Sequence, residues 1–147
     1  HQLKIKVICW SMPFVNHKLQ LDQPLRLIQI TLAGLWIYQG LIPKILFQST
    51  AEITIWQNMG LELPLAKMCV ALSGLIEIMF GCTFLIWQRA VFLHQLNIVG
   101  LSGLLLLIML TDPIQLSTAF NPVVMNTAMI VISMLAIQLF KLSQQQA

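Results

Sequence analysis

Four long apolar stretches, separated by short polar connections, make up most of the chain. They run from Leu25 to Phe47, from Leu65 to Trp87, from Ala90 to Leu110 and from Val123 to Phe140. Each reaches or approaches the roughly 20 residues that a helix needs to cross about 30 Å of hydrocarbon. Short connections make consecutive helices antiparallel neighbours. The pattern therefore predicts an all-α fold, a transmembrane four-helix up-and-down bundle.

Polar and turn-forming residues predict where these helices begin and end. Asp22 and Pro24 are an N-cap and an early-turn proline for the first span. Asn121 and Pro122 form the same pair for the fourth span, which is expected to close at Lys141. We therefore divide the chain into an N-terminal cytoplasmic or interfacial segment (1–22), a four-helix domain (23–142) and a polar tail (143–147).

The first connection is expected to contain a short helix. Ser49 with Glu52 three residues later resembles a capping box, and Gly60 provides a stop. Between them Ile53 and Trp56 recur at helical spacing. This spacing predicts a helix that lies flat in the headgroup region, with Trp56 as its anchor.

Composition supports a membrane environment. The chain of 147 residues is 58% hydrophobic and only 9% charged, whereas soluble domains carry about 25% charged residues. The lipid bilayer is therefore the first expected partner. For a chain of this length we expect no soluble second domain beside the four spans.

The placement of charge predicts the orientation in the membrane. Basic residues flank the first span's start, the second connection and the chain's end, whereas the first and third connections carry acids. The basic residues at these places are Lys4, Lys6, Lys18, Arg26, Arg89 and Lys141, and the acids are Glu52, Glu62 and Asp112. Lys67 is the one basic residue near the opposite side. By the positive-inside rule both termini are expected to be cytoplasmic. The net charge of only +3 gives no indication of nucleic-acid binding.

Glu77 is the most unusual residue of the second span, because it is the only formal charge between Lys67 and Arg89. A carboxylate at this depth costs on the order of 3 kcal/mol or more unless protein or water surrounds it. Residues at three- and four-residue spacing share its helix face: Val70, Ser73, Gly74, Gly81 and Phe84. Small residues allow close helix approach, so this face should point into the bundle. Three roles of Glu77 stay open. It could be a structural acid that holds two helices together, it could bind a ligand, proton or quinone-like head group, or it could face lipid without any role.

Depth along the helices suggests which side chains could meet Glu77. Tyr38 of the first span and Asn97 of the third lie at its level, and both can donate hydrogen bonds. Asn97 is read either as an interhelical hydrogen bond or as a ligand contact. Lys44 is read either as a snorkelling lysine at a helix end or as a cation at the mouth of a polar pocket that reaches Glu77. Asn126 of the fourth span lies at a similar depth.

Other familiar chemistry is disfavoured. Cys69 and Cys82 are too far apart along one helix to form a disulfide, and neither forms a CxxC motif with Cys9. His94 has no second histidine within the spans, so we expect this chain alone to bind neither haem nor a transition metal. We interpret the eight methionines as packing residues of the core rather than as copper ligands along a transport path.

Several short motifs resemble the DoxX-like family of small four-helix membrane proteins. They are Trp36-Ile-Tyr-Gln-Gly-Leu-Ile-Pro-Lys44, then Glu52 and Asn58-Met-Gly60, then Gly74-Leu-Ile-Glu77 with Gly81, and finally Asn121-Pro122. The matching positions are Tyr38, Gly40, Pro43, Lys44, Glu77, Gly81 and Pro122. The resemblance covers about residues 25 to 140. It implies a bundle in the bacterial cytoplasmic membrane and, through the family's namesake, a link to a quinol oxidase or thiosulfate:quinone oxidoreductase subunit.

Together these features predict a small-ligand-binding or accessory subunit of a quinone-linked redox system, without independent enzymatic activity. Its ligand-binding candidates are Glu77, Lys44, Tyr38, Asn97 and Asn126. The ligand could be a quinone or a small anion, and any redox centre would belong to a partner subunit. The alternatives are a structural or assembly module, and a small transporter that uses Glu77 as a proton relay. A homo-oligomer is a further expected form, because Gly34, Gly100 and Gly103 suit either internal packing or a dimer face.

Overall fold

The structure is a computed structural model that describes residues 17–111, 113 and 122–145. Its elements are α1 (His17–Gln39), the π-helical stretch η1 (Gly40–Leu46), α2 (Thr50–Asn58), α3 (Leu63–Ile86), α4 (Val91–Thr111) and α5 (Pro122–Gln145). The predicted interfacial segment before residue 17, and the predicted cap Asn121, lie outside the described residues. The described part of the chain contains only helices and their connections.

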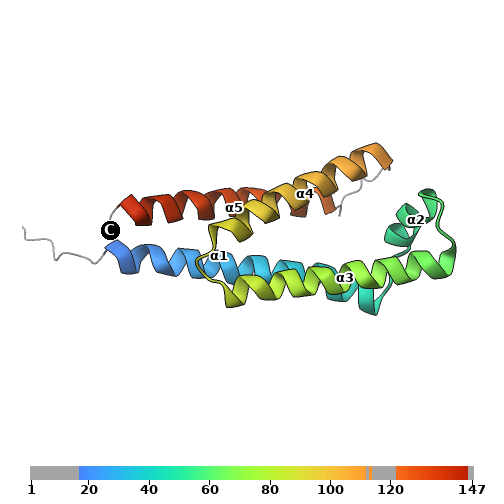
Figure 1. Cartoon of the computed structure of the whole chain (residues 1–147), viewed down its shortest axis with the longest axis horizontal. Helices are drawn as coiled ribbons and strands as arrows, with labels where there is room; N and C mark the ends of the chain where they lie inside the picture. The colour runs from blue at the N-terminus through green and yellow to red at the C-terminus, as the bar shows by residue number, and fades with distance from the viewer. Residues whose placement is uncertain (1–16, 112, 114–121, 146–147) are drawn as a thin grey trace, which may run out of the picture.

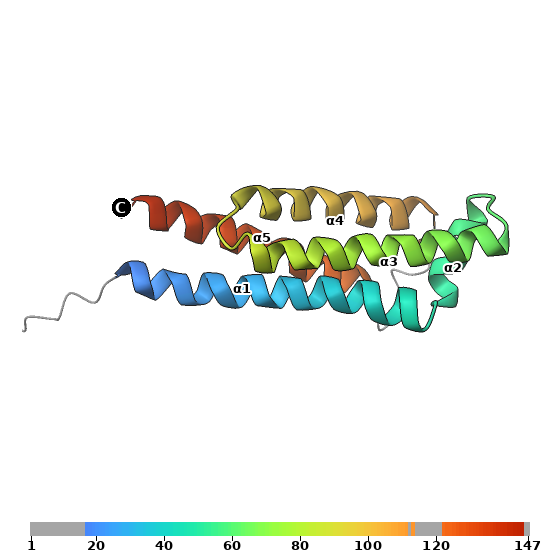
Figure 2. The same cartoon turned by 60° about the horizontal axis from the view of Figure 1, so that its bottom comes forward.

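The four long helices form a bundle in which neighbours alternate in direction (Figures 1 and 2). The first span, α1 with η1, packs chiefly against α3, and α4 packs chiefly against α5. The short helix α2 lies at one end of the bundle, and the start of α1 and the end of α5 lie at the other (Figure 1). The predicted up-and-down bundle, with a short helix in the first loop, is confirmed.

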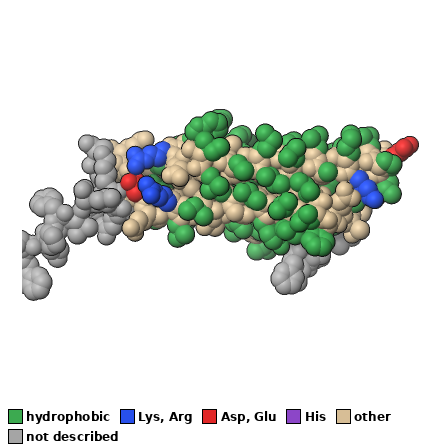
Figure 3. All heavy atoms as spheres, turned by 90° about the horizontal axis from the view of Figure 1, so that it is seen from below, with side chains coloured by type: hydrophobic (Ala, Val, Ile, Leu, Met, Phe, Trp, Pro, Cys, Tyr) green, Lys and Arg blue, Asp and Glu red, His purple; other side chains and the backbone are tan. Residues whose placement is uncertain are grey.

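All four long helices are long and apolar enough to cross a membrane. The candidate spans are Leu21–Leu46, Leu63–Ile86, Val91–Thr111 and Val123–Gln145. On the face seen in Figure 3, hydrophobic side chains cover the middle of the molecule and charged side chains gather at its two ends. The chain is therefore a multi-pass membrane protein with four spans, and its apolar surface suits a lipid bilayer.

The core lies where all four spans meet. Its buried apolar side chains are Leu32, Ala33, Trp36, Phe84, Leu93, Leu101 and Met129. Trp36 packs edge-on against Phe80, with ring centroids 5.0 Å apart. This aromatic contact fixes α1 against α3 at mid-depth.

The first span does not break at Pro43. Proline lacks the N–H that would bond the carbonyl four residues earlier, and the helix widens into η1 around it. The Phe47 N–H donates to the Ile42 carbonyl at 3.0 Å, and the Ser49 N–H donates to the Pro43 carbonyl at 2.7 Å. Short π-helical insertions are frequent at functional sites. Here the insertion changes which side chains of the last turns face α3.

Two predicted helix ends are wrong. The first span begins at His17, so Pro24 lies inside α1 and Asp22 does not cap it. Asp22 instead accepts hydrogen bonds from Arg89 at 3.3 Å, which ties α1 to the α3–α4 turn. The fourth span continues past Lys141 to Gln145. Both ends extend into polar sequence because helices at a membrane boundary can continue into the aqueous layer.

The helix α2 has the predicted position but not the predicted cap. Ser49 is the N-cap residue, yet its side chain makes no capping hydrogen bond. The Ile53 N–H donates to the Ser49 backbone carbonyl at 3.1 Å instead. Ile53 is buried against Ala66 and Val70 of α3. The capping-box prediction is wrong because Glu52 turns away from the helix start toward another partner.

Candidate functional site

The lysine at the end of the first span is buried rather than solvated. Lys44 lies in η1 and is only 8% exposed. It faces α3 at Gly74, where an added Cβ would come within 2.8 Å of the Lys44 Cβ and 2.7 Å of the Gly40 carbonyl oxygen. Only glycine allows this approach without displacing backbone. The interpretation of Lys44 as a snorkelling lysine is therefore wrong.

Two carboxylates from different helices meet Lys44. Its Nζ lies 2.5 Å from Glu77 Oε1 on α3 and 3.3 Å from Glu52 Oε2 on α2. The Glu77 side chain is 13% exposed and the Glu52 side chain is 30% exposed. We call Lys44, Glu52 and Glu77 the charged triad. It joins the first span, α2 and α3 at one point.

The triad contains more negative than positive formal charge. One ammonium faces two carboxylates, which gives a formal charge of −1 when both acids are ionised. In a poorly hydrated site these interactions are much stronger than in water, although desolvation offsets much of the gain. Loss of Lys44 alone would leave two acids close together without a counter-charge.

Glu77 retains unused hydrogen-bonding capacity. Its Oε1 accepts from Lys44, whereas its Oε2 is buried and has no hydrogen-bond partner within the described residues. The predicted orientation is confirmed, because Val70, Gly74 and Phe84 on the same face are buried. An acceptor that is buried and unpaired normally costs free energy. This oxygen is therefore available to a donor from a ligand.

The expected contacts of Tyr38 and Asn97 with Glu77 are wrong. Tyr38 is 56% exposed on the surface of α1. Asn97 accepts a hydrogen bond from Trp36 Nε1 at 2.7 Å and donates to Ser133 Oγ at 2.7 Å. The helix α4 packs chiefly against α5. Asn97 consequently faces α5 and α1 rather than α3.

Asn126 belongs to a separate contact as well. Its Oδ1 accepts a hydrogen bond from Gln39 Nε2 at 3.0 Å, which links α5 to α1. Asn126 is fully buried, and its Nδ2 has no partner in the described part of the chain. The structure thus brings Lys44 and Glu77 together, whereas Asn97 and Asn126 form interhelical hydrogen bonds elsewhere in the bundle.

The family of the chain follows from a sequence comparison. Residues 33–134, more than half of the chain, match the profile of the DoxX-like family. The chain belongs to the DoxX-like family. The matched region of this DoxX-like protein contains the whole charged triad. Neither the curated proteins nor the solved structures provide a match.

Glu52 is the site residue that the sequence reasoning missed. It stood within the motif that resembles DoxX-like proteins, but the capping-box pattern assigned it to the start of α2. A usable signal was present, because Glu52 follows Lys44 by only eight residues across a tight turn. Gln48 at that turn has a φ of 41°. This left-handed backbone helps to turn α2 back over the triad.

His94 of the DoxX-like chain lies in an aromatic enclosure away from the triad. It is fully buried, with its ring centroid 5.3 Å from that of Phe84 and 5.8 Å from that of Phe140. Its Nδ1 lies 3.5 Å from Ser133 Oγ. Among the described residues no group of three or more His, Cys, Asp and Glu side chains could hold a metal ion.

Proposed function

We propose that this DoxX-like protein is a small-ligand-binding or accessory subunit of a quinone-linked redox system, and that the charged triad receives the ligand's head group. The observation that carries this proposal is the buried Lys44–Glu77 pair beside an unpartnered Glu77 Oε2. It places a strong donor and a free acceptor at one point. Buried ionisable groups in membrane spans commonly mark such sites.

The chemistry of the triad favours a quinone-like head group over a small anion. A quinone carbonyl could accept a hydrogen bond from Lys44 Nζ, and a quinol hydroxyl could donate one to Glu77 Oε2. An anion that replaced Glu52 would gain no net charge attraction, because the charges of Lys44 and Glu77 cancel formally, and the Glu77 carboxylate would repel it. A neutral ring with polar edges avoids this repulsion.

Entry of the ligand would involve α2. The Lys44–Glu52 contact at 3.3 Å is longer than the Lys44–Glu77 contact at 2.5 Å, and Glu52 is the more exposed acid. We infer that a ligand replaces Glu52 at Lys44 while Glu77 stays in place. In this role α2 covers the triad, and electrons would reach the ligand from a redox centre in a partner subunit.

The distribution of exposed charge supports an orientation with both termini in the cytoplasm. Arg26 on α1, Arg89 in the α3–α4 turn and Lys141 on α5 lie at the end where α1 begins. Glu62 and one lysine, Lys67, lie at the α2 end. The positive-inside rule then places the triad near the outer surface of a bacterial cytoplasmic membrane.

Quinone titration of the purified protein tests the proposed site. We expect ubiquinone-1 to quench tryptophan fluorescence saturably, and Lys44→Met to weaken binding about tenfold or more, because a charge-assisted hydrogen bond contributes about 1.5–3 kcal/mol. Lys67→Met is the matched control, since Lys67 is an exposed lysine at the same end of the molecule.

The proposal is supported only if the affinity for ubiquinone-1 falls in Lys44→Met and does not fall in Lys67→Met. Equal affinities of wild type, Lys44→Met and Lys67→Met would assign the triad to a purely structural role. Far-ultraviolet circular dichroism of each variant establishes that the helices are retained.

A further inference from the structure

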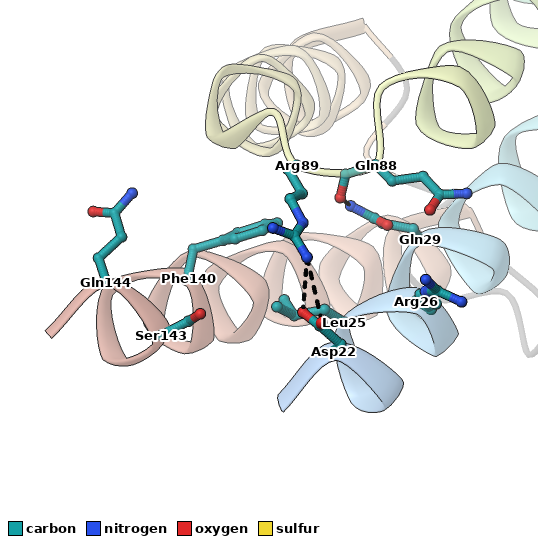
Figure 4. Close-up of a pocket in the computed structure, with 9 residues that line it drawn as sticks. All are labelled: Asp22, Leu25, Arg26, Gln29, Gln88, Arg89, Phe140, Ser143 and Gln144. Atoms are coloured by element: carbon teal, nitrogen blue, oxygen red, sulfur yellow. Dashed lines mark hydrogen bonds and ion pairs between the residues drawn. The ribbon is translucent and has the colours of Figure 1, made fainter. Parts of the chain in front are cut away.

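A second polar site lies at the opposite end of the bundle from the triad. An open hollow of about 180 Å³ is bounded by α1, the α3–α4 turn and α5. Figure 4 shows Arg89 reaching from the turn toward Asp22 on α1, with Phe140 of α5 beside it. The hollow has room for several water molecules, since one water needs about 10–15 Å³ of such space. It is large enough for a small polar head group.

Two arginines line this hollow. Arg26 follows Asp22 by one helical turn on α1, and Arg89 comes from the α3–α4 turn. Arg89 Nη2 lies 3.3 Å from Asp22 Oδ2, and the Arg89 side chain is 79% exposed. Exposed ion pairs of this kind are weak. Arg26 has no ion-pair partner among the described side chains, so both guanidinium groups can bind another anion.

The other walls combine polar and apolar groups. Ser143 of α5 adds a hydroxyl to the lining, while Leu25 and Phe140 provide a buried apolar floor. Gln29 also lines the hollow, but its amide already donates to the Gln88 carbonyl. A ligand here would meet charge at the open side and hydrocarbon below.

The hollow lies at the level where lipid head groups are expected. Trp87 immediately precedes its arginine-bearing turn and is 60% exposed, as is typical of an interfacial tryptophan. Leu27 and Ile30 of α1, close in sequence to Arg26, are 67% and 60% exposed. Apolar surface suited to acyl chains therefore begins beside the arginines.

We propose that this hollow binds the phosphate-bearing head group of an anionic phospholipid. Arg26 and Arg89 contact the phosphate oxygens, because guanidinium groups bind phosphate in a bidentate geometry. Binding replaces the Arg89–Asp22 contact. The adjacent exposed Leu27 and Ile30 favour a lipid over free phosphate, since a soluble anion gains nothing from apolar surface.

Native mass spectrometry of the full chain in detergent tests the proposal with phosphatidylglycerol and phosphatidylcholine of identical acyl chains. We expect preferential retention of phosphatidylglycerol. The double variant Arg26→Gln/Arg89→Gln should lower that affinity about thirtyfold, which corresponds to about fivefold for each basic residue near an anionic lipid surface. Lys67→Gln, an exposed lysine at the α2 end, should leave it unchanged.

A variant that is expected to bind the lipid more tightly controls for loss of binding through misfolding. Asp22→Asn removes the carboxylate that competes for Arg89, so phosphatidylglycerol binding should become tighter. Equal binding of the two lipids by wild type, or unchanged binding by the double arginine variant, would overturn the proposal. Displacement of phosphatidylglycerol by excess inorganic phosphate would assign the hollow to a soluble anion and would likewise overturn it.

Discussion

Lys44 has its position because three local features coincide. The widened helix around Pro43 directs Lys44 toward α3, the missing side chain of Gly74 leaves room for it, and Glu77 receives its charge. Removal of any one of these features should disturb the others, because residues in direct contact are energetically coupled. Gly74 can be tested without altering a charge.

Gly74→Ala should destabilise the protein by about 1–3 kcal/mol, the usual cost of adding a methyl group to a closely packed contact. The new Cβ would meet the Gly40 carbonyl oxygen and the Lys44 Cβ at less than 3 Å. Backbone cannot move aside as a flexible side chain can, so the first span and α3 must separate. The free energy of unfolding in mixed detergent–SDS micelles measures this change.

Gly100→Ala is the matched control. Gly100 also lies within a membrane span, but an added Cβ would meet nothing within 4 Å. Because alanine favours helix over glycine, Gly100→Ala should be neutral or slightly stabilising. Equal losses of stability in both variants would show that close approach at Gly74 does not hold the first span against α3.

Sequence reasoning gave Lys44 two alternatives, a snorkelling lysine or a cation at the mouth of a polar pocket that reaches Glu77, and the structure supports the second. Helical spacing placed Glu77 on the bundle-facing side correctly. Ideal α-helical geometry could not give the direction of Lys44, because the π-helical stretch from Gly40 changes the angular positions that follow it. A local change in helix geometry thus separates what could be predicted at this site from what could not.

At the scale of elements, hydropathy predicted the four spans well but not how they pair. The wrong expectation for Asn97 arose because equal depth was taken to imply contact, whereas α4 packs chiefly against α5. The sequence likewise did not show which glycines allow close contact between helices of the bundle. Gly34, Gly100 and Gly103 have open space around them, so they do not serve packing within the bundle. Gly74 and Gly81 do, against η1 and α1 respectively.

Glu52 of α2 could make either of two interactions, a helix cap or an ion pair. Glu52 fits a capping box by spacing, but an ion pair with a buried lysine replaces the cap. Capping contributes about 1 kcal/mol, whereas the poorly hydrated surroundings of the Lys44 ammonium strengthen its attraction for the Glu52 carboxylate. The larger electrostatic term therefore decides the position of Glu52. Spacing along the sequence does not contain this information.

At the scale of the whole molecule, the two polar sites lie at opposite ends of the bundle. The charged triad occupies the α2 end, and the arginine-lined hollow occupies the end where α1 begins and α5 ends. A span of this length places them near opposite faces of the bilayer. The orientation of the protein therefore decides which site faces the cytoplasm.

Thiol labelling of whole cells tests the proposed orientation. In a cysteine-free background, Glu62→Cys at the α2 end should react with a membrane-impermeant maleimide, and Gln144→Cys at the end of α5 should not. Both positions are exposed. Permeabilised cells, in which both thiols should react, provide the control, and the reverse pattern in intact cells would contradict the orientation inferred from the basic residues.

The most direct test of the triad as a binding site is the combined replacement Lys44→Met/Glu77→Gln. Removing Lys44 alone should cost about 3–5 kcal/mol of stability, whereas replacing a buried pair together is often nearly neutral. The double variant should therefore recover most of the stability lost in Lys44→Met. It separates the structural contribution of the pair from ligand binding.

The decisive measurement is ubiquinone-1 binding to this double variant, followed by tryptophan fluorescence at a temperature where it remains folded. We predict near-native stability together with binding at least about tenfold weaker than that of wild type, since the charged donor and the carboxylate acceptor are both absent. A stable double variant that binds the quinone as tightly as wild type would contradict the assignment of Lys44 and Glu77 as the ligand site.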